Sequence, residues 1–426
     1  MDKELNFFRK IIRKYNETNL ILRILAGLVI GALLGLLVPQ ATWISVLGSL
    51  FVGALKAIAP LLVFMLVISS LANGKTGFDR RFRFVIFEYL FSTFIAALVA
   101  VVFSFIFPVT MKLVGEAAQA EAVPTGIGEV LRNLLVGMFS NPIGAIVNGN
   151  YISILFWAVI FGILMRRVAS KKTKKVFTDL SNILSGAVKW IINLAPFGIL
   201  GLMFQNISEN GTAIFVDYGK LVLLLVASML TVALIVNPII VFVILRRNPY
   251  PLVFRCIRES GLTALFTRSS AANIPVNMRL CERLGLDRDI YSVSIPLGAT
   301  INMDGAAVVI TIMTLATART LGISVDFPSA VVLSILSTLA ACGASGVAGG
   351  SLLLIPMACS LFGIPADISM QVVGVGFIIS VVQDSLETAL NSSGDVVFTA
   401  TAEYRHWQKT GKSLPTFLGG EKKLDI

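Results

Sequence analysis

The residues best suited to bind a small polar ligand lie in one apolar segment near the C-terminal end of the chain. Asp384, Glu387, Thr388, Asn391 and Asp395 follow one another at intervals of three, one, three and four residues. On an α-helix this spacing places all five side chains along one stripe. A charged side chain at the centre of a bilayer costs about 2.5–3.5 kcal/mol even on lenient insertion scales. The stripe must therefore face protein, water or cations rather than lipid.

The composition is that of a protein embedded in a membrane. Of 426 residues, 56% are hydrophobic and 14% are charged, whereas soluble domains carry about 25% charged residues. The net charge of +11 comes mainly from the two ends of the chain and from short loops. Charge distributed in this way sets membrane topology and does not make a nucleic-acid-binding surface. The single histidine, His406, lies in the basic C-terminal tail, and the four cysteines lack metal-ligand spacing, so a histidine-based metal site or catalytic dyad is excluded.

Apolar segments with basic flanks predict an all-α polytopic membrane protein with eight spans and with both termini in the cytoplasm. The fourth span is predicted to be broken, because glycines and Pro142 interrupt it. The predicted spans are 20–39, 43–72, 84–112, 132–168, 178–205, 217–246, 290–319 and 367–404.

Two further segments are too polar in the middle to face lipid. Segment 250–278 has basic residues at both ends, and segment 327–364 has a glycine-rich centre at 343–350. We expect each to be a re-entrant helical hairpin, because irregular backbone is tolerated at membrane depth only where protein or a water-filled cavity covers it. Each hairpin precedes a polar or interrupted span, and this paired pattern indicates an inverted-repeat transporter with its site near the bilayer midplane. An ion channel with a re-entrant filter remains an alternative.

The polar groups at these breaks suit a small zwitterion and a hard cation. Helices that end within the membrane point backbone N–H groups toward a substrate carboxylate, whereas the carbonyl groups of unwound backbone suit cations. Asp384 is the candidate partner for an α-amino group, and oxygen ligands at depth favour sodium, although oxygens alone leave protons possible. Glu88, near the cytoplasmic end of its span, is expected to pair with Arg81 or Arg83.

These motifs resemble the dicarboxylate/amino acid:cation symporter family, which has the glutamate-transporter fold. The motifs are the serine-rich tip 268–275, the Asn-Met-Asp-Gly break at 302–305, the glycine-rich tip 343–350 and the polar stripe of the last span. Within the family, the likeness is closest to bacterial sodium/serine-threonine symporters.

The resemblance implies an elevator-type homotrimer in the bacterial inner membrane, with eight transmembrane helices and two re-entrant hairpins. Spans two, four and five would form a fixed scaffold, and spans three and six would move with the transport core. The implied divisions are a cytoplasmic N-terminal segment at 1–19, spans one to six at 20–248, the transport core at 249–404 and a cytoplasmic tail at 405–426.

The resemblance also implies which residues bind the cargo. Substrate would contact Arg268, Ser269, Ser270, Val347, Gly350, Ser351, Asp384, Glu387, Thr388 and Asn391. Sodium would be bound by three groups of residues: Asp395 with Gly298, Asn302 and Asn391; Thr300 with Ala341, Cys342 and Ala344; and Asp304 with Tyr89, Ser92, Thr93 and Asn302.

Departures from the family pattern bear on the substrate. Family members that carry acidic substrates have an arginine where this chain has Glu387 and a threonine where it has Ala306. Ser380 stands where such members often have an aspartate, which bears on the third sodium site. In the implied fold Arg268 is close enough to reach Glu387 and neutralise it, whereas an unpaired Glu387 would instead favour a cationic substrate. We expect sodium-driven import of serine and threonine. A sodium- or proton-coupled symporter of acidic amino acids or dicarboxylates is the alternative, and an enzyme is not expected because no nucleophile–base pair is present.

Overall fold

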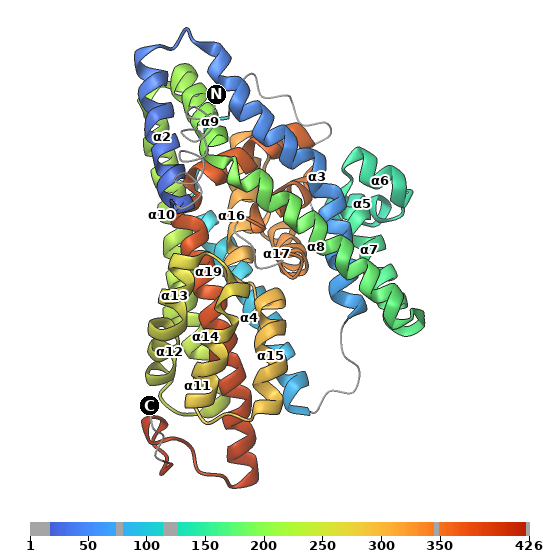
Figure 1. Cartoon of the computed structure of the whole chain (residues 1–426), viewed down its shortest axis with the longest axis vertical. Coiled ribbons are helices and arrows are strands. Elements are labelled where there is room, and N and C mark those ends of the chain that lie inside the picture. The colour runs from blue at the N-terminus through green and yellow to red at the C-terminus, as the bar shows by residue number, and fades with distance from the viewer. Residues whose placement is uncertain (1–17, 74–79, 114–126, 345–348, 423–426) are drawn as a thin grey trace, which may run out of the picture.

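The computed structural model describes residues 18–73, 80–113, 127–344 and 349–422. These residues form α-helices with short 3-10 and π segments, and they contain no β-strand. Figure 1 shows an elongated bundle in which α19 runs through the middle and ends near the C-terminus. The predicted all-α fold class is confirmed.

A first group of helices packs around α2 (Leu20–Leu37) and α3 (Ser45–Ala72), which are joined by the 3-10 turn η1 (Thr42–Ile44). Gly27 and Gly31 lie one turn apart on α2, and a Cβ atom there would lie 2.2 Å and 2.4 Å from the backbone oxygens of Pro196 and Leu200 on α9 (Ala195–Asn210). Glycines at this spacing let two helix backbones approach closely in a membrane. Helix α3 also contacts α7 (Tyr151–Val168) and α8 (Lys171–Asn193).

Two of the predicted spans are divided into shorter helices. The fourth consists of α5 (Ile127–Met138), α6 (Pro142–Asn148) and α7, so the predicted break is confirmed. The Asn141 side chain accepts bonds from the N–H groups of Ile143 and Gly144 at 2.9 and 3.0 Å, which caps α6. The fifth was predicted as one span at 178–205, and in the structure α8 ends at Asn193 and α9 begins at Ala195, because Pro196 fits the first turn of a helix and not its interior.

A second group packs against α19 (Ala366–Thr410). It includes α4 (Arg80–Ile106), α10 (Ile214–Thr231) and α11 (Asn237–Leu245), and the π segment η3 (Val232–Val236) packs against these three helices. Helix α4 begins and ends earlier than the predicted span 84–112. The π segment directly precedes Asn237-Pro238, where the proline lacks the N–H that a regular helix uses.

Both predicted helical hairpins are present. The first comprises α12 (Tyr250–Cys256), η4 (Ile257–Gly261), α13 (Leu262–Thr267) and α14 (Ser270–Arg283), with its tip at Arg268 and Ser269. The second comprises α17 (Phe327–Ala341), η5 (Ser351–Leu354) and α18 (Ile355–Ser360), and residues 345–348 of its tip lie outside the described residues. Both hairpins contact α19, the first through α13 and α14 and the second through η5 and α18. Figure 1 shows α12 and α14 in the lower half of the view and α17 near mid-height.

The seventh span is broken where the sequence predicted. Helix α15 (Arg288–Ile301) ends and α16 (Asp304–Thr320) begins around Asn302 and Met303. In the apolar windows of the α15–α16 and α19 runs, 89% and 72% of residues are buried, compared with 28% in α2. The polar faces of α16 and α19 are therefore surrounded by protein rather than lipid. The tail carries one 3-10 turn, η6 (Thr416–Leu418).

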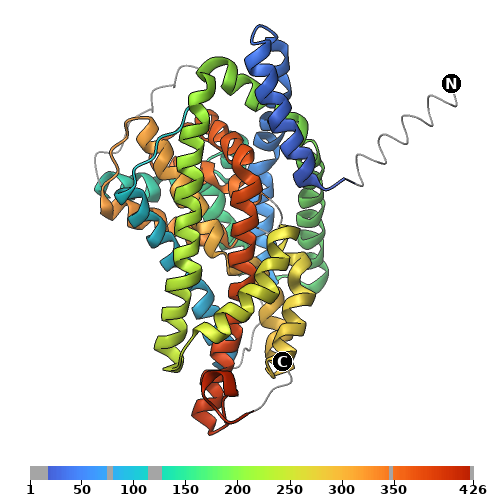
Figure 2. The ribbon, with the colours of Figure 1, turned by 90° about the vertical axis from the view of Figure 1, so that its left-hand side faces the viewer.

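Seven helical runs among the described residues are long and apolar enough to cross a membrane, or eight if the bent pair α5–α6 counts as one span. One run, 195–245, contains α9, the 3-10 turn η2 (Gly211–Ala213), α10 and α11, and Figure 2 shows the chain turning between α9 and α10. Large apolar side chains such as Leu22, Trp43 and Leu223 are exposed on the outer helices. The chain is a multi-pass membrane protein.

Candidate functional site

Asp384 lies where the two hairpin tips meet α19. Its Oδ2 accepts a hydrogen bond from Arg268 Nε of the first tip at 2.6 Å. Its Oδ1 accepts one from the backbone N–H of Gly349 of the second tip at 3.1 Å. The side chains of Arg268 and Asp384 are only 7% and 3% exposed. One buried carboxylate thus holds both tips.

Glu387 lies one turn further along the same face of α19, but it does not pair with Arg268. Its Oε2 accepts a hydrogen bond from Ser351 Oγ at 2.7 Å and a short one from Gln383 Nε2. The sequence left open whether Arg268 pairs with Glu387, and in this structure Arg268 bonds Asp384 instead. Both carboxylates lie on the same face of α19 and within one turn of each other, so the spacing alone does not decide which one the guanidinium binds.

The remaining predicted substrate residues lie on α19 or at the two hairpin tips, with one exception that lies outside the described residues. Thr388 donates its hydroxyl to the backbone oxygen of Asp384 at 2.7 Å. Ser269 caps α14 by accepting a bond from the N–H of Ala272 at 3.2 Å, and Ser270 is buried beside it. Gly350 is buried next to Gly349. Val347 lies outside the described residues.

A second buried carboxylate, Asp304 at the start of α16, is enclosed by neutral donors. Ser92 Oγ and Thr93 Oγ1 donate to its Oδ1 at 2.8 and 3.0 Å. Asn237 Nδ2 donates to its Oδ2 at 3.3 Å. Asp304 has no basic partner in the part of the chain that the structure describes. A buried carboxylate with neutral donors alone calls for a proton or a cation.

A third buried carboxylate, Asp395, is only partly satisfied. Asn302 Nδ2 donates to its Oδ1 at 3.0 Å, whereas its Oδ2 is buried and has no hydrogen-bond partner among the described residues. Gly298 lies close by, because a Cβ atom there would lie 2.6 Å from Asp395 Oδ1 and 2.9 Å from the hydroxyl of Tyr89. That hydroxyl donates to the backbone oxygen of Asp395 at 3.0 Å. The structure brings these predicted ligands together.

Asn302 and Asn391 join the break in span seven to α19. Asn302 Nδ2 donates to the backbone oxygen of Asn391 at 3.0 Å, and Asn391 Oδ1 accepts the N–H of Gly305 at 2.7 Å. The Asn391 amide nitrogen lies 3.4 Å from Met303 Sδ, which is a weak acceptor. This nitrogen therefore keeps most of its capacity to donate a hydrogen bond.

The predicted ligands around Thr300 form a looser group. The Thr300 hydroxyl donates to the backbone oxygen of Leu297 at 2.7 Å. Cys342 Sγ lies 3.7 Å from the backbone oxygen of Ile301, which places the end of α17 beside the break. Ala341 and Ala344 are buried there. Among the described residues, no hydrogen bond joins Thr300 to this end of the second hairpin.

Sequence reasoning missed two residues that support the carboxylates and one that fastens the first hairpin. Asn237 bonds Asp304, and Gln383 bonds Glu387. Ser392 on α19 accepts Asn273 Nδ2 at 2.7 Å, which fastens the first hairpin to α19. The signal available for Asn237 was a lone amide within an apolar run, and for Gln383 it was the position four residues before Glu387 on the same helix.

Glu88 does not form the predicted pair with Arg81. Arg81 bonds Asp287 at 3.0 Å and Glu403 at 3.3 Å. Glu88 is buried, and neither of its carboxylate oxygens has a hydrogen-bond partner among the described residues. Arg81 lies about two turns from Glu88 on the helix, which is too far for the usual pairing at three or four residues.

Outside the membrane-spanning segments, Asp287 anchors the start of α15. The N–H of Asp289 donates to its Oδ1 at 3.0 Å, and Arg81 Nη1 donates to its Oδ2 at 3.0 Å. The hydrogen bond from the Asp289 N–H has the larger effect and the bond from Arg81 the smaller, and together they hold the pKa of Asp287 below its ordinary value.

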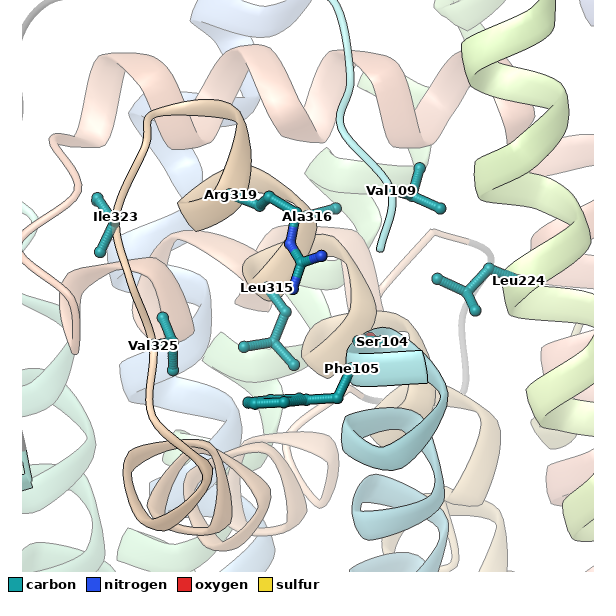
Figure 3. A pocket seen from close by; sticks show the side chains of 9 residues that line it. All are labelled: Ser104, Phe105, Val109, Leu224, Leu315, Ala316, Arg319, Ile323 and Val325. Carbon is teal, nitrogen blue, oxygen red and sulfur yellow. The ribbon is translucent and has the colours of Figure 1, made fainter. Parts of the chain in front are cut away.

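The cavity in Figure 3 is distinct from these groups. It lies at the ends of α4 and α16, where Ser104, Phe105, Leu315 and Arg319 line it together with residues of neighbouring segments. Its volume of about 30 Å³ suits a single water molecule. None of the predicted binding residues lines it.

Comparison with known proteins gives a consistent result. The sodium:dicarboxylate symporter family matches residues 20–404. The serine/threonine transporter SstT of Bifidobacterium adolescentis is 60% identical over 96% of this chain and 95% of its own length. A protein of the same name from Streptococcus thermophilus is 58% identical over 94% of this chain and 100% of its own length. One from Streptococcus agalactiae is 60% identical over 93% of this chain and 98% of its own length. The relatives are transporters, as predicted, and the chain belongs to the sodium:dicarboxylate symporter family.

Proposed function

We propose that the protein is a secondary active transporter that imports serine and threonine together with sodium ions. The observation that carries this proposal is the pair of buried carboxylates, Asp304 and Asp395, which have no basic partner among the described residues. Such groups are tolerated in a membrane protein when a proton or cation neutralises them. Their neighbours are hydroxyl, amide and carbonyl oxygens, which suit a hard cation such as sodium.

The substrate pocket lies between the two tips and α19. Asp384 would bind the α-amino group of the substrate. The Asn391 amide nitrogen and the hydroxyl of Ser270 would bind its carboxylate. Ser351 and Glu387, which bond each other at 2.7 Å, would offer a donor and an acceptor to a substrate hydroxyl. Serine and threonine have these three groups, and both amino acids appear in the names of the relatives reported above.

Glu387 argues against acidic substrates. A second carboxylate about 4 Å from it would be disfavoured by about 4 kcal/mol at an effective dielectric of 20, which is about three orders of magnitude in affinity. We therefore place aspartate and dicarboxylates among the rejected compounds.

The packing agrees with an elevator mechanism. Helices α2, α3, α7, α8 and α9 contact one another, whereas α4, α10, both hairpins and α16 pack mainly on α19 or on one another. The first group would be the scaffold and the second the transport core. We propose a homotrimer in the bacterial inner membrane with cytoplasmic termini.

Uptake into proteoliposomes tests the substrate and the coupling ion. Labelled serine and threonine should accumulate only with an inward sodium gradient, and aspartate should not accumulate. The double variant Glu387→Arg with Ala306→Thr should move selectivity toward aspartate. If the unaltered protein already accumulates aspartate well, the argument from Glu387 is wrong and an acidic-substrate symporter replaces the proposal.

A further inference from the structure

Arg268 occupies an unusual position at the tip of the first hairpin. Its backbone has a φ of 52°, which lies in the left-handed region that residues other than glycine rarely adopt. It ends α13, and its N–H bonds the backbone oxygen of Ala264 at 2.8 Å. The conformation directs the side chain inward, where it bonds Asp384. A buried ion pair is thus built on a strained tip residue.

The partner of Arg268 is the carboxylate assigned above to the substrate. Asp384 receives Arg268 on Oδ2 and the N–H of Gly349 on Oδ1. A guanidinium and a substrate ammonium group are both cations that satisfy a buried carboxylate by charge-assisted hydrogen bonds. The ammonium group of an amino acid that binds Asp384 can therefore take the place of Arg268 on Oδ2.

We propose that Arg268 is an internal substitute for the substrate's amino group, and this inference rests on the transport function proposed above. When the pocket is empty, the guanidinium neutralises Asp384, and the two tips close on the same carboxylate. When substrate enters, its ammonium group takes Asp384 and releases the arginine. The zwitterion adds one positive and one negative charge, so the net charge of the site is unchanged.

This exchange of partners matters for one part of the transport cycle. Net uptake requires the substrate-free carrier to close and return, whereas exchange of internal for external substrate requires only the loaded carrier. With Arg268 removed, an empty pocket would contain an uncompensated buried carboxylate, which is strongly disfavoured. Closure without substrate would therefore be impaired more than closure with substrate.

Comparison of net uptake with exchange in proteoliposomes tests the proposal. In R268Q, sodium-driven net uptake of labelled serine should fall by at least about tenfold. Serine–serine exchange at saturating serine should fall by a clearly smaller factor than net uptake, and the serine concentration for half-maximal exchange should fall, because a competitor is gone. R268K keeps the charge and should restore part of the net uptake. If net uptake and exchange fall together, or if the half-maximal concentration rises, Arg268 binds substrate directly and the proposal is overturned.

A second measurement requires no substrate. Cys342, beside the second tip, is partly exposed, whereas Cys256, Cys281 and Cys359 are buried. Thiol labelling of Cys342 in the sodium-loaded, substrate-free protein should be faster in R268Q, because the tips open. The double variant R268Q/D384N removes both charges and should return the labelling rate toward that of the unaltered protein. An unchanged rate in R268Q overturns the proposal. If the unaltered protein carries no serine but R268Q still labels faster, the serine assignment fails and the closing function of Arg268 stands.

Discussion

A methyl group added at Gly298 tests whether Asp395 belongs to a cation site. In Gly298→Ala the new Cβ would lie 2.6 Å from Asp395 Oδ1 and 2.9 Å from the hydroxyl of Tyr89. Neither oxygen can retreat freely. Asp395 Oδ1 is bonded to Asn302, and the Tyr89 hydroxyl is bonded to the backbone of Asp395 and to Thr399 at 2.9 Å. The carboxylate must therefore shift by several tenths of an ångström.

The size of the effect follows from this overlap. Inserting a methyl group into a tightly packed region typically costs about 1–3 kcal/mol. If the cost falls on the cation-loaded geometry, the sodium affinity drops by about 5- to 150-fold. The fold itself should be little affected, because alanine is a better helix former than glycine by about 1 kcal/mol.

The assay is serine uptake as a function of external sodium concentration. Gly298→Ala should need at least about fivefold more sodium for half-maximal uptake. Gly219→Ala on α10 is the matched control, because a Cβ atom there meets nothing within 4 Å. If Gly298→Ala and the control give the same sodium dependence, the site at Asp395 does not hold the coupling ion.

Three further predictions concern single carboxylates. Asp384→Asn should abolish serine binding in calorimetry while sodium binding persists, and equal loss of both would make Asp384 a cation ligand. Glu88→Gln should leave the melting temperature unchanged or raised, because the buried carboxylate makes no hydrogen bond among the described residues; a marked drop would reveal a partner. Asp287→Ala should lower stability by about 1 kcal/mol at neutral pH through loss of a helix cap. Because the pKa of Asp287 is lowered in the folded protein, its contribution is present above the ordinary aspartate value and is lost as the pH falls through the folded value. The difference between the two proteins should therefore disappear in acid, and a constant difference would contradict this reasoning.

Much of the fold was predictable because helix-incompatible residues stand at the breaks. The Asn302–Gly305 break and both hairpins were predicted from polar and glycine-rich residues within apolar segments, and these features are present. The division of the fifth span was not predicted. Pro196 is the signal there, but a proline can begin a helix as well as kink one, and the sequence does not distinguish the two.

The partners of the charged residues were less predictable. Spacing placed Asp384 and Glu387 on one face of α19, but the choice of Arg268 between them depends on the backbone conformation at the hairpin tip. Arg81 was assigned by nearness in sequence, yet it bonds Asp287 and Glu403, which are far away along the chain. Contacts of this kind depend on packing that one sequence does not reveal.

The most direct test of sodium-coupled transport is serine accumulation in proteoliposomes with sodium and membrane potential varied independently. One net positive charge carried inward contributes about 2.3 kcal/mol per 100 mV, which corresponds to about 50-fold accumulation. Uptake should require external sodium and should increase when the inside is made negative. Full accumulation on a proton gradient without sodium would contradict the account.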